Sequence, residues 1–383
     1  MLSPTIRGLN RMKILYASDS IIPSSFANTV QVLKMCDAFA ENKHEVTLFA
    51  SRGPGSCRDL LRKYGLIHQF PIVRTNRIKL RFLGSALYTL LQYSKVNKNG
   101  KPDLYYGRNC HLLYLLRKKS IPIIYETHNA PIGLRRRIEG KLFSSRNCVR
   151  VVTISNSLKI WYLENFRNLR DESVLVAHDG STKVRKLKVN SVASIRRDAR
   201  PCIGYTGSLF PGKGIEIILQ ISAQIPKADF HVFGGSQEEI TKIRNTSEVP
   251  PNVIFHGHIE HYLLPSYRDQ FDVALLPVME RVFSTYDRKL NMADFMSPMK
   301  IFEYMASGLP IVASDLPVIR EVLSDNGNAL LVKSKDIRRW VVRIQQLLEE
   351  KSLAQKIGKQ AKDDFESKYT WTKRAKNVLA NVI

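Results

Sequence analysis

Short apolar runs alternate with helically spaced apolar positions along almost the whole chain. Residues 29–39, for example, carry apolar side chains at helical spacing between two such runs. Six runs in the first half are predicted strands, at residues 12–17, 44–50, 103–106, 122–125, 151–154 and 174–177. Strands that alternate with helices are typical of parallel sheets, so this half predicts a doubly wound α/β domain.

A polar, basic segment at residues 183–200 interrupts this pattern, and we interpret it as a linker. A second series of predicted strands follows, at residues 202–207, 229–233, 253–255, 272–276, 309–313 and 329–332. Helical spacing covers residues 215–224, 337–350 and 352–380. We therefore predict two domains, at residues 1–182 and 201–365, with a C-terminal helix at 366–383 that returns to the first domain. In such sheets ligands bind beyond the carboxyl ends of the strands, so a ligand between the domains is expected.

The segment 297–315 predicts a short helix that leads into a strand. Ser297 is a suitable helix cap, and Pro298 after it is tolerated at the first helical position. Gly308 suits a left-handed helix end.

The start of this helix combines groups that suit a sugar nucleotide. The amides of Met299 and Lys300 lack acceptors within the helix and can bind a phosphate. One turn later, the carboxylate of Glu303 can accept hydrogen bonds from ribose hydroxyls.

A glycine-rich loop, Gly207 to Gly214, lies between a predicted strand and a predicted helix. Its glycines let the backbone approach an anion, and Lys213 adds a positive charge. No Lys-Ser or Lys-Thr pair stands at Walker A spacing, which disfavours an ATPase. A tight turn with a solvated lysine is the alternative interpretation of this loop alone.

The net charge of +25 lies mostly in the first half of the chain. Residues 1–182 contain 29 Lys or Arg and 12 Asp or Glu, whereas residues 201–383 contain 23 and 21. A basic face of this kind attracts anionic lipid headgroups, nucleic acid or a phosphorylated acceptor, unless it serves only solubility. The phosphate-site motifs lie in the nearly neutral half, and no RNA- or DNA-binding signature is recognised, which disfavours a nucleic-acid-binding protein.

Membrane spans, disulfides and metal sites are not expected. No apolar run approaches the roughly 18 residues that span a bilayer, and no signal peptide is recognised. The five cysteines have no CxxC spacing and predict reduced thiols in a cytoplasmic protein. No Asp-x-Asp pair or ligand cluster indicates a metal ion, and no cofactor is implied.

The second half resembles the donor domain of retaining glycosyltransferases of the GT-B fold, in the group 1 or family 4-like class. Four motifs match in order and spacing: residues 207–214, 253–257, 272–277 and 297–315. The first half resembles the family more loosely, at residues 126–128, 153–155 and 176–180 among others. The resemblance implies two Rossmann-like domains that face each other across a cleft, and a nucleotide-diphosphate sugar as co-substrate.

The resemblance also implies roles for individual residues. His128 would face the donor sugar, Lys213 would bind the donor diphosphate, and Glu303 would bind the ribose; these three are the predicted catalytic residues. The nucleoside would also contact Gly257. The other predicted diphosphate-binding residues are Gly207, Ser208, Met299, Lys300, Phe26 and Ala27.

The chain departs from the family pattern at three places. Phe295 stands where a glutamate often contacts the sugar, and Ser208 replaces a frequent phosphate-binding arginine, whose charge Lys300 or Arg281 would supply. The first-domain loop at residues 23–29, commonly glycine-rich, carries bulkier side chains here, with Asn28 as the expected helix cap.

The predicted function is transfer of a sugar from a nucleotide-diphosphate sugar to a hydroxyl, with retention and without a metal, in the assembly of a cell-surface polysaccharide or glycolipid. Electrostatic stabilisation of the departing diphosphate would carry catalysis. The basic half would bind a glycan or a lipid-linked acceptor, or it would hold the protein peripherally at the inner face of the plasma membrane. The alternatives are a sugar-nucleotide epimerase or hydrolase of the same fold, which should carry more carboxylates near the sugar, and a nucleic-acid-binding protein.

Overall fold

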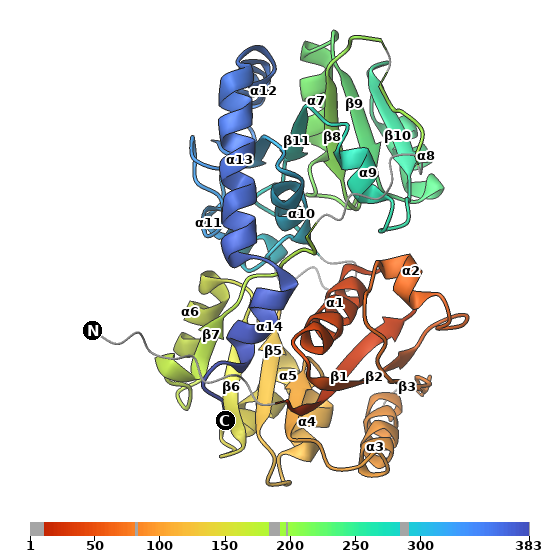
Figure 1. Ribbon diagram of the computed structural model, residues 1–383, viewed down its shortest axis with the longest axis vertical. Helices are drawn as coiled ribbons and strands as arrows, with labels where there is room; N and C mark the ends of the chain where they lie inside the picture. The colour runs from red at the N-terminus through yellow and green to blue at the C-terminus, as the bar shows by residue number, and fades with distance from the viewer. Residues whose placement is uncertain (1–10, 81–82, 184–191, 197, 284–290, 383) are drawn as a thin grey trace. The chain divides into compact units, whose positions relative to one another are not determined.

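The computed structural model describes residues 11–80, 83–183, 192–196, 198–283 and 291–382 (Figure 1). They form two compact units. The N-terminal unit contains the described residues of 1–153, 159–177 and 371–383, and the C-terminal unit contains those of 154–158 and 178–370. The contacts thus divide the chain after Ala177, where the sequence suggested residue 182. Of the expected linker at 183–200, residues 184–191 and 197 lie outside the described residues.

The N-terminal unit is built on a parallel sheet of seven strands in the order β3-β2-β1-β4-β5-β6-β7. The strands are β1 (Lys13–Ile22), β2 (Glu45–Arg52), β3 (Ile72–Thr75), β4 (Leu104–Gly107), β5 (Ile123–Thr127), β6 (Cys148–Thr153) and β7 (Val174–Val176). Six of them were predicted. The edge strand β3 was not, because only Thr75 of its four residues is buried and the apolar signal is weak.

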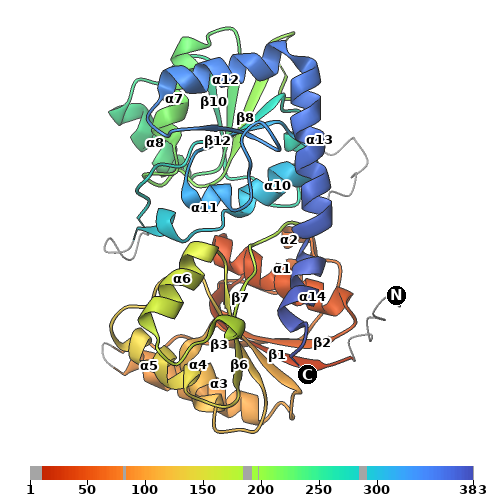
Figure 2. The same cartoon turned by 90° about the vertical axis from the view of Figure 1, so that its left-hand side faces the viewer.

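Helices cover this sheet. They are α1 (Ala27–Glu41), α2 (Leu60–Tyr64), α3 (Gly84–Asn97), α4 (Cys110–Leu116), α5 (Gly133–Phe143), α6 (Asn156–Asn165) and α14 (Trp371–Leu379), with a 3₁₀ turn at Asp171–Ser173. Helix α1 buries every residue from Thr29 to Phe39 and packs beside α14 (Figure 2). The last helix therefore belongs to the N-terminal unit.

The C-terminal unit contains a second parallel sheet, with six strands in the order β10-β9-β8-β11-β12-β13. The strands are β8 (Cys202–Thr206), β9 (Asp229–Phe233), β10 (Val253–Gly257), β11 (Val273–Leu276), β12 (Ile311–Ser314) and β13 (Leu330–Val332). Gly204 lies in the middle of β8 because the ring of Phe271 packs directly on it; a Cβ there would lie 2.0 Å from that ring.

The helices of this unit are α7 (Ile215–Gln224), α8 (Gln237–Thr246), α9 (Leu264–Arg268), α10 (Met299–Ser307), α11 (Pro317–Arg320), α12 (Ile337–Glu349) and α13 (Lys351–Lys368), with a 3₁₀ turn at Met292–Asp294. The sequence predicted one helix over residues 352–380, but the structure has two helices there: α13 ends at Lys368 and α14 begins at Trp371. Two parallel sheets flanked by helices confirm the predicted α/β class. No helix among the described residues is both long and apolar enough to cross a bilayer.

Candidate functional site

The loop after β8 has a backbone that only glycine adopts easily. The φ angles of Gly207, Gly212 and Gly214 are 148°, 83° and 94°, and Gly214 caps α7 in the left-handed region. A Cβ on Gly214 would lie 1.7 Å from the carbonyl oxygen of Pro277. The loop therefore lies tightly against the end of β11, and neighbouring groups leave no room for a side chain at these glycines.

Two lysines converge on this loop. A Cβ on Gly207 would lie 2.4 Å from Nζ of Lys300, so the ammonium group lies directly over this glycine. Lys213 is half-buried, and burial lowers its pKa. Burial lowers the pKa of Lys300 further still, and the charge of Lys213 adds to the effect while Glu303 opposes it.

Lys300 forms no hydrogen bond with any described residue, although its Nζ is shielded from solvent. It lies over the ring of Tyr205, 3.9 Å from the ring centroid. The hydroxyl of Tyr205 donates to the carbonyl oxygen of Ser208 at 2.8 Å, which fixes the ring against the loop. Arg281, the other residue considered for the missing charge, is exposed and meets the loop through its main chain at Gly212.

Helix α10 is tied to β8 by one buried tyrosine. The main-chain N–H of Thr206 donates to the hydroxyl of Tyr304 at 2.8 Å. Because Tyr304 lies one turn after Lys300 on α10, this bond positions the start of the helix beside the glycine-rich loop.

The start of α10 differs from the prediction by one residue. Pro298, not Ser297, is the N-cap, and the hydroxyl of Ser297 instead accepts a hydrogen bond from the main-chain N–H of Asp179 at 3.0 Å. The N–H groups of Met299 and Lys300 still lie in the first turn, which offers no acceptor within the helix. Gly308 ends the helix in the left-handed region, with φ of 67°, as predicted.

Glu303 is held by two partners that the sequence did not suggest. Its Oε2 accepts from Nη1 of Arg268 and its Oε1 from Nε2 of His261, each at 3.0 Å. Burial alone would raise the pKa of this carboxyl, but Arg268 and His261 lower it to about 2. Glu303 is therefore ionised, and each of its oxygens keeps a second lone pair for a ligand hydroxyl.

Gly257 ends β10 at a crossing of main chains. Its carbonyl oxygen accepts from the N–H of Gly234 at 2.7 Å, and Gly234 packs so closely on Gly207 that a Cβ would lie 1.8 Å from the Gly207 carbonyl oxygen. The ends of the three strands β8, β9 and β10 thus meet next to the loop.

Phe295, which stands where the family often has a glutamate, is half-buried. Its carbonyl oxygen accepts a hydrogen bond from the hydroxyl of Ser155 at 2.9 Å.

The remaining predicted residues belong to the N-terminal unit. Phe26 is the N-cap of α1 and Ala27 is its first residue, so the amides of both lie at the start of this helix. The prediction that Asn28 caps this helix is wrong: its amide donates to the hydroxyl of Ser20 at 3.3 Å, and no side chain caps the helix. Phe26 is 46% exposed.

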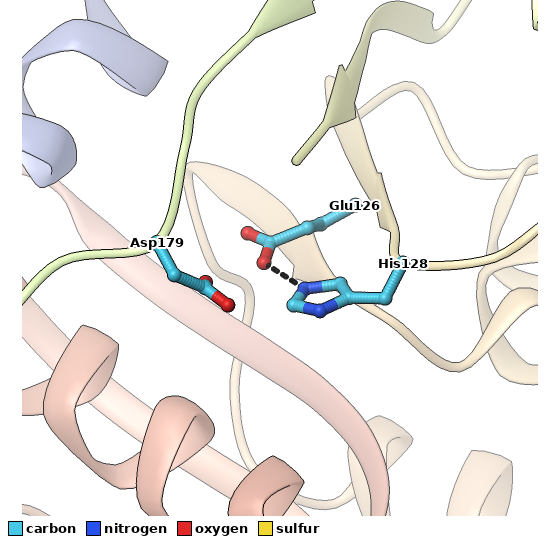
Figure 3. Close-up of side chains that lie close together, drawn as sticks. All are labelled: Glu126, His128 and Asp179. Carbon is cyan, nitrogen blue, oxygen red and sulfur yellow. Dashed lines mark hydrogen bonds and ion pairs between the residues drawn. The ribbon is translucent and has the colours of Figure 1, made fainter. Parts of the chain in front are cut away.

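His128 follows β5 and is bound to a buried carboxylate (Figure 3). Its Nε2 lies 2.6 Å from Oε1 of Glu126. Burial, reinforced by Arg108, lowers the pKa of His128 to about 3 in spite of Glu126. The imidazole is therefore neutral at pH 7 and donates its Nε2–H to Glu126, which leaves Nδ1 as the acceptor.

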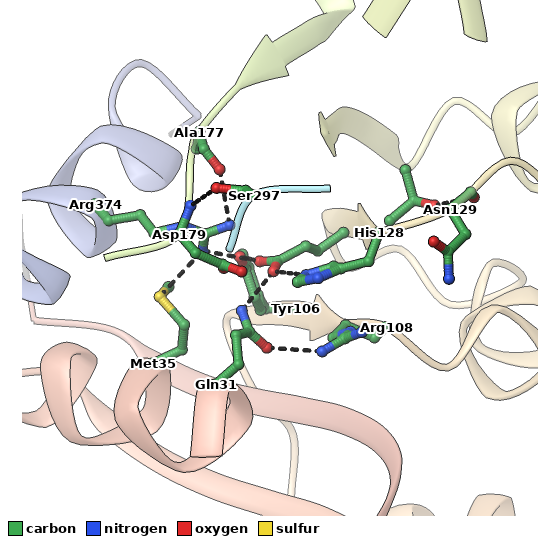
Figure 4. A network of polar contacts seen from close by, with 12 residues as sticks. Gln31, Met35, Tyr106, Arg108, His128, Asn129, Ala177, Asp179, Ser297 and Arg374 are labelled. Atoms are coloured by element: carbon green, nitrogen blue, oxygen red, sulfur yellow. Dashed lines mark hydrogen bonds and ion pairs between the residues drawn. The ribbon is translucent and has the colours of Figure 1, made fainter. Parts of the chain in front are cut away.

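Glu126 is bound by several polar side chains, of which Figure 4 labels Gln31, Tyr106, His128 and Arg374. Gln31 donates to its Oε1 at 2.6 Å, and Tyr106 and Arg374 donate to its Oε2, Arg374 at 3.1 Å. Burial opposes the charge, but Arg374 and His128 hold the pKa of Glu126 well below its ordinary value. Arg374 comes from α14, so the last helix of the chain fixes the carboxylate that orients His128.

The loop and α10 of the C-terminal unit thus bring together Gly207, Ser208, Lys213, Lys300 and Glu303. Sequence reasoning missed Arg268, His261, Tyr205, Glu126 and Arg374. Only Glu126, two residues before His128, carried a local signal, because a carboxylate beside a strand-end histidine commonly fixes its tautomer.

Known proteins are related to this chain in sequence and in fold. The model for "Glycosyltransferase Family 4" matches residues 29–180, and the model for "Glycosyl transferases group 1" matches residues 200–350. A putative teichuronic acid biosynthesis glycosyltransferase, TuaH of Bacillus subtilis, is 22% identical over 48% of this chain and 38% of its own length. The chain spans 38% to 60% of the length of the curated relatives that it matches.

Solved structures share the fold over nearly the full length. Sucrose-phosphate synthase from Thermosynechococcus elongatus has a TM-score of 0.71 at 16% identity, and the match covers 96% of this chain and 97% of that one. HepE of Anabaena in complex with UDP-glucose has a TM-score of 0.68 at 17% identity, with 96% and 98% covered. Taken with the two family models, these matches show that the chain belongs to the group 1 glycosyltransferases of the GT-B fold.

Proposed function

We propose that this glycosyltransferase moves a sugar from a nucleotide-diphosphate sugar to a hydroxyl acceptor, with retention at the anomeric carbon. The observation that carries the proposal is the pair Lys213 and Lys300 at the glycine-rich loop, with Nζ of Lys300 shielded from solvent and without a hydrogen-bond partner among the described residues. An unpaired ammonium in a buried position is costly unless an anion compensates it. A diphosphate against Gly207 would be such an anion.

The same groups would assist bond cleavage. As the bond between the anomeric carbon and the diphosphate breaks, negative charge grows on the phosphate oxygens. Lys213, Lys300 and the first-turn amides of α10 would stabilise that charge more strongly than the ground state. The acceptor hydroxyl would attack from the face that the diphosphate leaves, and His128 would face the donor sugar.

We further propose that the reaction needs no divalent metal ion and no other cofactor. Two lysine ammonium groups and a helix N-terminus would supply positive charge where a metal ion would otherwise meet the diphosphate. Glu303, ionised and held by Arg268 and His261, would accept the ribose hydroxyls, and Gly257 would lie against the nucleoside.

The relatives suggest the class of donor and product. HepE is known in complex with UDP and with UDP-glucose, and TuaH is named for teichuronic acid biosynthesis. We propose a nucleotide sugar as donor and a cell-surface polysaccharide or glycolipid as product. The basic N-terminal unit would bind a glycan or lipid-linked acceptor at the inner face of the plasma membrane.

A thermal-shift screen against UDP, GDP, ADP and their sugars, with and without EDTA, tests the donor site. We expect one nucleotide family to raise the Tm equally in both buffers. Lys213→Ala should lose most of that shift, whereas Lys227→Ala, a change at an exposed lysine of the same unit, should keep it. The proposal fails if none of these nucleotides stabilises the parent, or if Lys213→Ala responds as the parent does.

A further inference from the structure

Helix α3 has its leucines on the outside. Leu83, which precedes its first turn, is 63% exposed, and Leu87, Leu90 and Leu91 are 37%, 53% and 45% exposed. The spacing of residues 83, 87 and 90 places these side chains along one side of the helix. An amphipathic helix of a globular protein normally turns such a stripe toward the core, so the arrangement of α3 is inverted.

Polar contacts hold the opposite side of α3 against the sheet. Gln92 is fully buried; its Nε2 donates to the hydroxyl of Tyr88 at 2.7 Å, and its Oε1 accepts from Asn109 at 2.9 Å. The hydroxyl of Tyr88 also lies 2.7 Å from that of Ser51 on β2. Because these hydrogen bonds anchor the helix, the outward leucines are not needed for packing it onto the unit.

Positive charge surrounds the leucine stripe. Residues 60–102 contain nine Lys or Arg and no Asp or Glu. Helix α3 lies beside β3 (Figure 1). Lys79 and Leu80 are exposed just before this helix, and Lys98 is exposed just after it. Lys118, at the end of the adjacent α4, is exposed as well.

An apolar stripe with exposed lysines before and after it, in a segment without acidic residues, matches an anionic lipid surface. The leucines would enter the boundary between headgroups and acyl chains, while the lysines would remain at the level of the phosphates. A protein partner would have to offer an apolar groove with a strongly acidic rim. A second copy of the chain would bring the same positive charge to the interface, which disfavours self-association through this face.

We propose that α3 docks the protein on an anionic membrane, with Leu83, Leu87, Leu90 and Leu91 inserted and Lys79 and Lys98 at the headgroups. The inference rests on the proposed peripheral placement of the N-terminal unit and names the element that makes the contact. It does not depend on Lys213, Lys300 and Glu303, which lie in the other unit.

Co-sedimentation of the full chain with phosphatidylcholine vesicles, with or without phosphatidylglycerol, tests the docking surface. We expect binding only to the anionic vesicles, weakened by salt. The double change Leu87→Gln and Leu90→Gln should lower the partition coefficient about tenfold, because two leucine side chains are no longer transferred from water into the membrane. Lys79→Glu with Lys98→Glu should lower binding and its dependence on salt.

The control is Ile160→Gln with Val342→Gln, since Ile160 is 48% and Val342 45% exposed on helices other than α3. This variant should bind as the parent does. If the leucine variant also binds as the parent does, α3 is not the docking element, although peripheral placement stands. If the parent ignores anionic vesicles, both fail, while the thermal shift with nucleotide still reports on the donor site. A parent dimer that the leucine variant converts to monomer, with vesicle binding unchanged, would assign the face to a second copy.

Discussion

The ammonium group of Lys300 lies 3.9 Å from the centroid of the Tyr205 ring, and no described residue accepts a hydrogen bond from it. The face of the ring has a negative potential that attracts the cation, but a cation–π contact does not replace the hydration that a buried ammonium group loses. We therefore expect the free-energy cost of burying this ammonium group to be recovered when an anion binds. This relationship leads to two predictions.

Lys300→Met should change stability and ligand binding in opposite directions. The thioether chain fills a similar space without a charge, so the unliganded variant should be as stable as the parent or up to about 2 kcal/mol more stable. Affinity for the nucleotide diphosphate should fall about 10- to 100-fold, because a charge-assisted hydrogen bond is lost. Urea unfolding and isothermal titration calorimetry measure the two effects.

Lys227→Met is the matched control for this experiment, since Lys227 is exposed in the same unit. Neither stability nor affinity should change by more than about 0.5 kcal/mol. Equal loss of stability and of binding in Lys300→Met would show instead that Lys300 is a structural residue.

Nucleotide binding should take up protons. Burial and the neighbouring Lys213 lower the pKa of Lys300 in the unliganded protein, and a bound diphosphate raises it again. Affinity should therefore decrease as the pH rises from the lower, unliganded pKa to the higher, liganded one. Calorimetry in buffers of different ionisation enthalpy measures the uptake, which Lys300→Met should reduce; a parent that releases protons would contradict the prediction.

The parts of the site that lie close together in sequence could be predicted. The glycine-rich loop and the left-handed Gly308 follow from local backbone chemistry, and the strands follow from apolar runs. The cap of α10 was misplaced by one residue because Ser297 forms a tertiary hydrogen bond with the main chain of Asp179 instead of capping the helix. Local propensity alone does not contain that competition.

The partners of the charged residues could not be predicted. Arg268 and His261 precede Glu303 by 35 and 42 residues, and Arg374 follows Glu126 by 248. Which charges meet depends on how the strands and helices pack, and the periodicity of a single sequence does not report side-chain pairs. The sequence therefore suggested Glu303 and His128 as candidates but not the groups that fix their charge and direction.

Arg268→Met should destabilise the protein by about 3–5 kcal/mol at pH 7, because it leaves Glu303 buried without its cation. The double change Arg268→Met with Glu303→Leu removes both charges and should recover most of the loss. Urea unfolding of the parent, both single variants and the double variant gives the coupling free energy. A coupling near zero would mean that the ion pair does not hold Glu303.

The same pair should make stability depend on pH. The pKa of Glu303 is about 2 in the folded protein, below the ordinary value of 4.5, so its contribution is complete above pH 4.5 and is lost as the pH falls toward 2. In Arg268→Met the largest charge that opposes the effect of burial is removed, so the pKa of Glu303 should rise above that of the parent. The stability difference between parent and variant should thus shrink between pH 7 and pH 3; a constant difference would contradict the assignment.

His128 should act as a neutral group throughout the ordinary pH range. Its pKa of about 3 lies far below 6.5, because burial and Arg108 outweigh the effect of Glu126, so no limb of the pH–rate profile should fall near 6.5. His128→Gln can still donate to Glu126 and should keep the nucleotide-induced thermal shift, while kcat falls at least about 10-fold. His111→Gln, a change at a half-buried histidine of the same unit, serves as the control and should keep kcat. A profile with a limb near pH 6.5 that disappears in His128→Gln would show that the imidazole titrates, and would overturn its assignment as a neutral hydrogen-bonding group.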